Sequence, residues 1–284
     1  MMNRILRNAF SIYRKFLKNV LLITFHILNA LPRGRFATSD ALDSIFGKKT
    51  SVSIDSKSLE FHSPNWITNY RAKSILLKEP ETIQWIKSMN LGSVLWDIGA
   101  NIGTFTLYAA SRKIKVVAIE PSFMNIELLN RNVISNQLAD LVTILPFGVG
   151  SRTAVLDFFM SPEYLTWGGA HNSLGTNVGS GGESIKNPIR THSLSFSIDL
   201  LIDIFKLPYP SHIKIDVDGL ELEILKGALK TLKTVDSVLI EVDTKFVGNM
   251  DGIKSILEDS GLKIENSGQD NDGSHNQIWH RLSR

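Results

Sequence analysis

The hydrophobic residues of this chain follow two different periods, and the places where the period changes mark the predicted elements. Short continuous apolar runs at residues 94–96 and 116–119 are typical of strands buried on both faces. Apolar residues spaced three and four apart at residues 104–111 and 125–136 indicate amphipathic helices. Buried strands that alternate with helices predict a doubly wound, mostly parallel sheet.

The same alternation continues to the end of the chain. Further strands are predicted at residues 141–145, 212–219 and 237–242, and further helices at 199–205, 220–231 and 253–260. Residues 262–265 and 277–281 form a predicted closing antiparallel pair, and residues 154–159 an extra strand. We therefore expect an α/β fold with a Rossmann-like seven-stranded sheet, an antiparallel last strand and an N-terminal helical extension.

The pattern divides the chain into three regions. Residues 1–35 are expected to form a basic amphipathic helix, and residues 36–90 a lead-in with a small β-hairpin and a helix at 81–89. Residues 91–284 carry the sheet. Within them, the glycine-rich stretch at residues 161–190 interrupts the alternation, and long loops of this kind are often functional. We expect this stretch to be a loop on the substrate side of the site.

The N-terminal region combines apolar residues with basic ones. Seven Lys and Arg residues, and no acid, precede Asp40. Lys18, Asn19 and His26 interrupt the apolar run, which leaves it too short and too polar to predict a membrane span. Two interpretations stay open: a helix packed on the sheet domain, or a helix at residues 1–31 that makes a peripheral contact with an anionic membrane.

Composition excludes several classes of site. The chain of 284 residues has no cysteine, which rules out disulfides, thiolate catalysis and cysteine-ligated zinc. The expected location is the cytoplasm, with a peripheral contact at the inner face of a membrane as the alternative. Outside the N-terminal region the sequence lacks a basic stripe and a base-flipping motif such as Asn-Pro-Pro-Tyr, so we expect no nucleic-acid partner.

The strongest candidate for a binding site follows the first predicted core strand. The strand ends at Asp97, the chain turns through Gly99 and Gly103, and a helix begins. Glycines in such a turn allow backbone N–H groups to approach a nucleotide-like ligand. Glu120 ends the next strand, 17 positions after Gly103, close to the spacing at which such folds place an acid on a ribose. A solvated acid at a strand end is the plainer interpretation of Glu120 alone.

The turn argues for a cationic cofactor. A nicotinamide-binding turn ordinarily has three glycines, whereas Asn101 stands between the two glycines here. The carboxylate of Asp97 would repel a pyrophosphate and attract the cationic amino-acid end of S-adenosylmethionine. Gly148 and Val149 follow the third predicted strand, where they could contact adenine or form a plain turn. The predicted cofactor-binding residues are Asp97, Ile98, Gly99, Ala100, Asn101, Gly103, Glu120, Pro121, Gly148 and Val149.

These motifs resemble those of the FkbM-type class I S-adenosylmethionine-dependent methyltransferases. The similarity includes Asp97-Ile98-Gly99-Ala100-Asn101-Ile102-Gly103, Ala118-Ile119-Glu120-Pro121, Gly168-Gly169-Ala170-His171-Asn172-Ser173 and Lys214-Ile215-Asp216-Val217-Asp218-Gly219. It extends over residues 90–284 and leaves out the N-terminal region. The resemblance implies O-methylation of a small-molecule, glycan or lipid acceptor such as a sugar or secondary metabolite. The family more often has Glu where this chain has Asp218.

Catalytic candidates lie at the predicted carboxyl edge of the sheet, where open α/β folds bind ligands. Asp216 is the first choice as general base or metal ligand, and Glu241 could join it around a divalent cation. His171 is a second candidate base, and Asn172 and Ser173 could orient the acceptor hydroxyl. Two alternatives to a methyltransferase stay open: a nicotinamide-dependent oxidoreductase, and a non-catalytic membrane-associated protein on the same fold.

Overall fold

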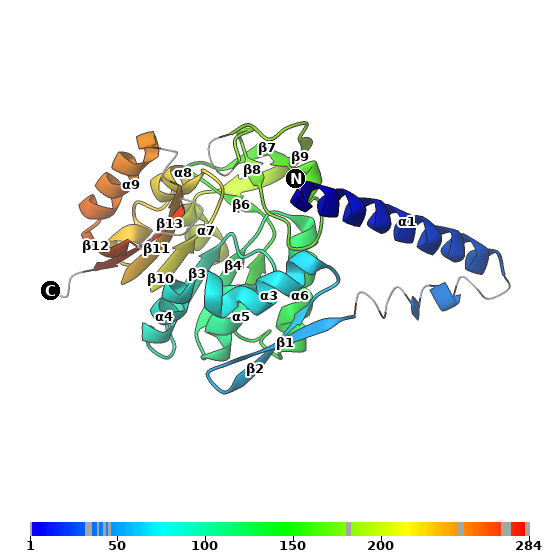
Figure 1. Cartoon of the computed structure of the whole chain (residues 1–284). Helices are drawn as coiled ribbons and strands as arrows, with labels where there is room; N and C mark the ends of the chain where they lie inside the picture. Colours follow the sequence, from blue (N-terminus) through cyan, green and yellow to red (C-terminus); the bar gives the residue numbers. More distant parts are fainter. Residues whose placement is uncertain are drawn as a thin grey trace. The chain divides into compact units, whose positions relative to one another are not determined.

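The chain divides into two compact units. The computed structural model describes residues 2–31, 36–38, 40–41, 44, 47–179, 183–243, 247–267 and 274–281. The units are Met1–Lys48 and Lys49–Arg284, and each is described by itself. The first contains helix α1 (Met2–Ala30), dark blue in Figure 1. Among the described residues, no helix has the length and apolar content needed to cross a membrane.

The second unit is built on a sheet that has seven strands in the described residues. Their order is β12–β13–β11–β10–β3–β4–β5. The bounds are β3 (Val94–Ile98), β4 (Lys115–Ile119), β5 (Val142–Leu145), β10 (His212–Ile215), β11 (Ser237–Asp243), β12 (Leu262–Ser267) and β13 (Ser274–Arg281). Neighbours from β11 to β5 are parallel, whereas β13 is antiparallel to both β11 and β12. The predicted fold class and its closing antiparallel pair are confirmed.

Helices cover both faces of this sheet (Figure 1). Alternate side chains of β3 enter separate cores, because neighbouring residues of a strand point to opposite faces: Leu95 belongs to one core and Trp96 to the other. The Leu95 core is closed by α3 (Trp66–Lys78), α4 (Pro80–Ser88), α5 (Thr104–Ser111) and α6 (Phe123–Ser135). The Trp96 core is closed by α7 (Ile198–Phe205), α8 (Glu221–Lys226) and α9 (Val247–Asp259). The carboxyl ends of the parallel strands stay available for a site.

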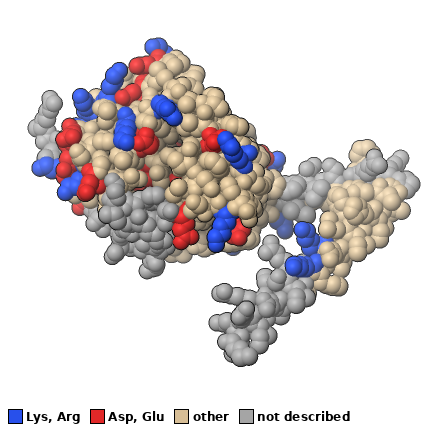
Figure 2. Space-filling view, turned by 90° about the horizontal axis from the view of Figure 1, so that it is seen from above, with Lys and Arg blue, Asp and Glu red and all other residues tan. Residues whose placement is uncertain are grey.

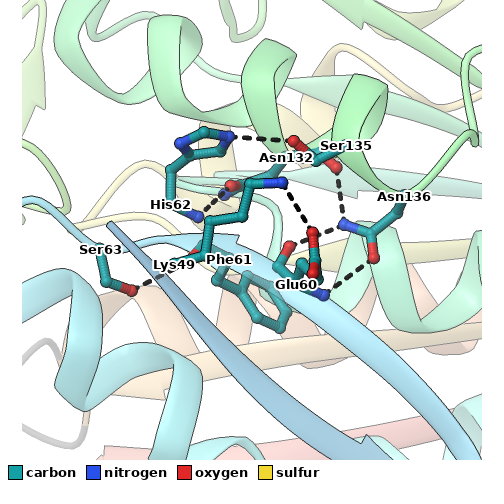
Figure 3. A network of polar contacts seen from close by, with 8 residues as sticks. All are labelled: Lys49, Glu60, Phe61, His62, Ser63, Asn132, Ser135 and Asn136. Atoms are coloured by element: carbon teal, nitrogen blue, oxygen red, sulfur yellow. Dashed lines mark hydrogen bonds and ion pairs between the residues drawn. The ribbon is translucent and has the colours of Figure 1, made fainter. Parts of the chain in front are cut away.

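The predicted hairpin is present and is fastened to α6. It consists of β1 (Lys49–Ile54) and β2 (Lys57–His62), which pair antiparallel. Figure 3 shows the Asn136 side chain bonded to the backbone N–H and carbonyl of Glu60, and the Asn132 side chain accepting from the His62 N–H at 2.7 Å. Asn132 also donates to the Ile102 carbonyl at 2.8 Å. One buried amide therefore joins the hairpin to the glycine turn after β3.

A second, four-stranded sheet has the order β6–β9–β7–β8 in the described residues. Its strands are β6 (Gly148–Val149), β7 (Ala154–Met160), β8 (Asn172–Leu174) and β9 (Ile189–Phe196). The extra strand predicted at residues 154–159 is β7. The prediction that residues 161–190 form one loop is wrong in part, because a 3₁₀ turn (Pro162–Tyr164), β8 and the start of β9 lie inside it. Residues 180–182, within its glycine run, lie outside the described residues.

Further elements differ from the predicted ones. The strand predicted at residues 212–219 ends at Ile215, and the helix predicted at residues 253–260 begins at Val247. Helix α3 was not predicted, because its large residues Trp66, Tyr70 and Leu77 are exposed and break the helical period of apolar positions. The helix predicted at residues 220–231 ends at Lys226. The Cα of Gly227 lies against the Gly150 backbone, where a Cβ would stand 2.1 Å from the carbonyl oxygen. On the face of the larger body seen in Figure 2, Lys and Arg lie among Asp and Glu.

Candidate active site

The glycine turn after β3 carries the structure that the sequence predicts for a ligand cradle. Gly99 has a φ of +84°, and a Cβ on it would stand 1.9 Å from the Asp216 carbonyl oxygen. The N–H groups of Gly99 and Ala100 both donate to the Ile119 carbonyl, at 2.9 and 3.1 Å. These bonds fix the turn to the end of β4. Glycine is required here both for the backbone conformation and for the close approach of the chain after β10.

Glu120 lies directly after β4 and faces the same turn. Its two carboxylate oxygens accept from the backbone N–H groups of Asn101, at 2.9 Å, and Ser122, at 2.8 Å. Burial raises the pKa of Glu120 to about 7, although these hydrogen bonds oppose the rise. The side chain is therefore held in one orientation and titrates near neutral pH, unlike the solvated acid of the plainer interpretation.

Two adjoining hollows open at the carboxyl edge of the sheet. The first, of about 140 Å³, holds seven of the predicted cofactor residues in its wall: Ile98, Gly99, Asn101, Glu120, Pro121, Gly148 and Val149. The second, of about 610 Å³, has Asp97 and Ala100 in its wall and shares Gly99, Asn101 and Asp216 with the first. Gly103, directly before α5, borders neither hollow. Its backbone packs against the side chains of Leu107 in α5 and Leu129 in α6.

Asp97 is more deeply buried than the sequence suggests. Its side chain is 1% exposed, and one carboxylate oxygen accepts from the Thr106 hydroxyl at 2.5 Å. Burial raises its pKa, while the ammonium of Lys214 and the Thr106 hydrogen bond oppose that rise. Asp97 is thus a buried acid in the wall of the second hollow, held by the helix that follows the glycine turn.

Asp216 and Glu241, the two acids predicted for catalysis, are brought together. They come from the ends of β10 and β11 and share a hydrogen bond between their carboxyl groups. Burial alone would raise the pKa of Asp216, but Lys214 and the hydrogen bond from Glu241 hold it well below its usual range. The charge of Asp216, together with burial, raises the pKa of Glu241 to about 9. The two carboxyl groups therefore titrate as a coupled pair, in which Asp216 is the more acidic.

Lys214, a basic residue of the buried strand β10, supplies the positive charge beside this pair. Its side chain is 1% exposed, and its ammonium lies 2.5 Å from an Asp216 carboxylate oxygen and 4.0 Å from one of Glu79. It also lies 4.8 Å from the centroid of the Phe105 ring. Burial would lower the pKa of Lys214, but Asp216, Glu79 and Asp97 raise it above its usual value.

Glu79 is a site residue that the sequence analysis missed. It lies between α3 and α4, is buried, and accepts from the Thr82 hydroxyl at 3.1 Å. Burial raises its pKa, and the charge of Lys214 opposes the rise. The one sequence signal that could have located it is Pro80, which begins α4 and so marks Glu79 as the residue before a helix. Its contact with Lys214 depends on the fold and cannot be read from the sequence.

The predicted substrate-side loop lies in the walls of both hollows. The Gly169 carbonyl accepts from the side-chain amides of Asn101, at 3.0 Å, and Asn125, at 3.1 Å. Arg71 of α3 donates through Nε to the Gly168 carbonyl at 2.7 Å. The loop is thus bonded both to the glycine turn and to α3.

The polar residues of this loop separate into two groups. His171 borders the second hollow, with its ring centroid 4.5 Å from that of Tyr164, and Asn172 borders the first. Asp218 accepts from the backbone N–H groups of His171 and Asn172, and burial raises its pKa to about 6. Ser173 lies buried in β8, 3.5 Å from the Thr176 hydroxyl, and borders neither hollow.

A metal site is not formed by these acids alone. Within the part of the chain that the structure describes, no three His, Asp or Glu side chains are grouped as a metal site requires. Asp216 and Glu241 make the pair suggested by the sequence, and the Lys214 ammonium already lies on Asp216. A divalent cation there stays a prediction.

Comparisons with known proteins identify similar sequences and structures. Residues 97–264 match the family model described as the methyltransferase FkbM domain. Hexuronic acid methyltransferase AglP of Haloferax volcanii is 34% identical over 149 residues, which are 52% of this chain and 55% of that protein. Methyltransferase sdnD of Sordaria araneosa is 27% identical over 189 residues, with coverage of 59% and 73%. The chain therefore spans about half the length of AglP.

Among solved structures, magnesium protoporphyrin IX methyltransferase (ChlM) from Synechocystis PCC 6803, with bound SAM, aligns with a TM-score of 0.47. It is 10% identical, and the alignment covers 77% of this chain and 85% of that one.

Proposed function

The chain belongs to the FkbM family of methyltransferases, and on that premise we propose that it transfers the methyl group of S-adenosylmethionine to a hydroxyl oxygen of a sugar. The match of residues 97–264 to the family model is the observation that carries this proposal, since it spans the glycine turn, the Glu120 carboxylate and the Asp216–Glu241 pair. It favours methyl transfer over the nicotinamide-dependent oxidoreductase and the non-catalytic protein that the sequence left open.

The residues of the first hollow fit S-adenosylmethionine, the methyl donor of the family. Gly99 lies in the wall of that hollow, and the carboxylate of Glu120 borders it as an acceptor for ribose hydroxyls. Gly148 and Val149 offer a backbone and an apolar wall for adenine. When bound, the cofactor supplies an electrophilic methyl group on a sulfonium. Asp97, in the adjoining hollow, is the acid for its cationic end.

The chain's own contribution to the reaction is alignment and proton removal. Asp216 borders both hollows, so a hydroxyl held against it in the second hollow can point toward the first. The hydroxyl oxygen becomes positively charged as it bonds to carbon, and it is then a strong acid. Even a carboxylate of low basicity such as Asp216 can accept its proton. His171, in the same wall, is the second candidate base.

A sugar acceptor is supported by the relative named a hexuronic acid methyltransferase. Its test is incubation of the full chain with S-adenosylmethionine labelled on the methyl group and a panel of sugars, glycans, lipids and secondary metabolites. We expect a mass increase of one methyl on a sugar, and we expect that methyl to resist mild alkali, since a methyl ether survives conditions that hydrolyse a methyl ester. Methyl transfer to lipids or secondary metabolites alone would contradict the sugar proposal.

Helix α1 supports a second, separate proposal of peripheral binding to an anionic membrane. Phe16 and Ile27 lie on one face of the helix and are 62% and 59% exposed, and the same helix carries Lys15 and Lys18. Apolar side chains next to basic ones suit the boundary between acyl chains and anionic headgroups. Such contact at residues 1–31 would hold the enzyme near membrane-linked acceptors.

A further inference from the structure

One face of α3 forms a wall of the second hollow. The side chains that share this face are spaced three and four residues apart and border the hollow together: Ile67, Tyr70, Arg71, Ser74, Ile75 and Lys78. They extend over about three helical turns. Trp66, at the start of the helix, borders the same hollow. The hollow therefore has an ordered wall of aromatic and basic groups that the reaction itself does not require.

The aromatic part of this wall is exposed. Trp66 and Tyr70 lie four positions apart, so they are neighbours on the helix, and they are 67% and 57% exposed. Large rings in a hollow that do not fill a core are suited to hold a ligand with an apolar face. The C–H groups on one face of a sugar ring carry partial positive charge and pack on the negative face of an aromatic ring.

The basic part of the wall has a fixed geometry at Arg71. Its Nε donates to the Gly168 carbonyl at 2.7 Å, which sets the plane of the guanidinium. Among the residues that the structure describes, no hydrogen bond joins its two Nη groups to a protein acceptor, and Arg71 borders both hollows. A guanidinium in this state is suited to a carboxylate, which accepts two parallel N–H bonds. Lys78 adds a second cation, with its ammonium 3.7 Å from a Glu79 oxygen.

We propose that α3 is the acceptor-binding helix and that it selects a sugar bearing a carboxylate, with the carboxylate on Arg71 and the ring against Trp66 and Tyr70. This rests on the proposed function and narrows its acceptor. The wall of the second hollow also carries Asp216 and Glu241. With the carboxylate of the sugar on Arg71, a hydroxyl of the same ring can face Asp216.

The competing ligand for Arg71 is the carboxylate at the amino-acid end of the cofactor, because Arg71 also borders the first hollow. The two ligands have the same chemistry, so separate titrations must distinguish them. An acceptor role predicts loss of acidic-sugar binding with cofactor binding retained. A cofactor role predicts the reverse.

The experiment titrates methyl glucuronoside and methyl glucoside, which differ in a carboxylate against a hydroxymethyl group, into the full chain saturated with S-adenosylhomocysteine. We expect the wild type to bind the glucuronoside more tightly. In Arg71→Gln, which keeps an amide to donate to Gly168, we expect that affinity to fall about 10- to 100-fold with little change for the glucoside. Lys73→Gln removes the same charge from an exposed position of α3 outside both hollows and is the matched control.

Three results would overturn the proposal: equal affinity of the wild type for the two sugars, the same loss in Lys73→Gln, or weaker S-adenosylmethionine binding in Arg71→Gln with sugar selectivity retained. The comparison of ligands on the wild type does not depend on a variant that folds. Methyl transfer with labelled cofactor is measured in parallel. Equal kcat/KM on both sugars would contradict the α3 proposal and support the proposed function, whereas selective binding without any transfer would contradict the function and support the α3 site.

Discussion

Gly99 and Asp216 are packed so closely that a single added carbon on Gly99 would stand 1.9 Å from the Asp216 carbonyl oxygen. The turn that lines the first hollow is therefore in backbone contact with the residue proposed to receive the acceptor's proton. The turn and the proposed general base are not independent parts of the site, since the position of one limits the position of the other.

Gly99→Ala should abolish saturable binding of S-adenosylmethionine, because the Cβ can be accommodated only if the turn or the chain at Asp216 moves. Gly92→Ala is the matched control: Gly92 has nearly the same φ, +82°, but nothing lies within 4 Å of its added Cβ. The control should keep its cofactor affinity, and its free energy of unfolding should fall by only roughly 1–2 kcal/mol, the cost of a left-handed backbone conformation for alanine. Calorimetric titration and melting temperature measure the two effects, and normal cofactor affinity in Gly99→Ala would contradict the interpretation.

Asp216→Asn should lower kcat by about 10²- to 10⁴-fold, the usual contribution of a positioned acid or base. Asparagine keeps the shape of the side chain but cannot take a proton from the reacting oxygen. Cofactor binding should persist, because the Gly99 contact involves the backbone of Asp216. Single-turnover rates and a cofactor titration on the same preparation measure this, and a rate within a factor of about ten of the wild type would remove Asp216 from the chemistry.

The activity of the wild type should fall as pH rises through about 9, where Glu241 loses the proton that it shares with Asp216. Above that pH two carboxylates repel each other and the hydrogen bond is lost. Glu241→Gln keeps a donor for Asp216 and should remain active with the alkaline decline removed. Glu221, whose pKa burial raises to about 8, borders the same hollow. If the alkaline decline disappears in Glu221→Gln and persists in Glu241→Gln, it belongs to Glu221, and the prediction for Glu241 is wrong.

Binding of S-adenosylmethionine should strengthen about tenfold between pH 6 and pH 8, because Glu120 has a pKa of about 7 and accepts ribose hydroxyls as a carboxylate. The sign follows from burial: the raised pKa keeps Glu120 partly protonated at pH 6, and ionisation restores its acceptor oxygens. Glu120→Gln should bind more weakly and without this pH dependence. Exposed Glu258 provides the control Glu258→Gln, and a wild-type affinity that is flat across this range would contradict the role of Glu120.

The full chain should sediment with vesicles containing phosphatidylglycerol and much less with pure phosphatidylcholine, and salt should weaken the binding. Phe16→Asp with Ile27→Asp should weaken it at least about tenfold, since these two exposed side chains share one face of α1 and both lose burial among acyl chains. Leu91→Asp changes a leucine outside α1 that is 82% exposed, and it should have no effect. Equal sedimentation of all three proteins would rule out α1 as the contact.

Local sequence was sufficient for the central sheet. The apolar runs at Val94–Ile98 and Lys115–Ile119 have both faces buried, so each shows its pattern without information from distant residues. The glycine turn was predictable for the same reason, because a φ of +84° at Gly99 needs a glycine whatever surrounds it.

The charged cluster of Glu79, Lys214 and Asp216 was less predictable, because its contacts join distant segments of the chain. Lys214 looks out of place in an apolar strand until Glu79, 135 positions earlier, is seen beside it. Helix α3 was missed since Trp66 and Tyr70 are exposed toward a hollow rather than buried in a core, which removes the apolar period that a helix normally shows.

The carbonyl of Gly169 accepts hydrogen bonds from the side-chain amides of Asn101 and Asn125, and it thereby joins the loop to the glycine turn. A cofactor that shifts Asn101 also shifts the loop over the second hollow, so the two ligands are thermodynamically coupled. The acceptor should then bind with different affinity to the enzyme loaded with the methyl donor and to the enzyme loaded with the demethylated product. Order of addition and product inhibition are the measurements that would show this coupling.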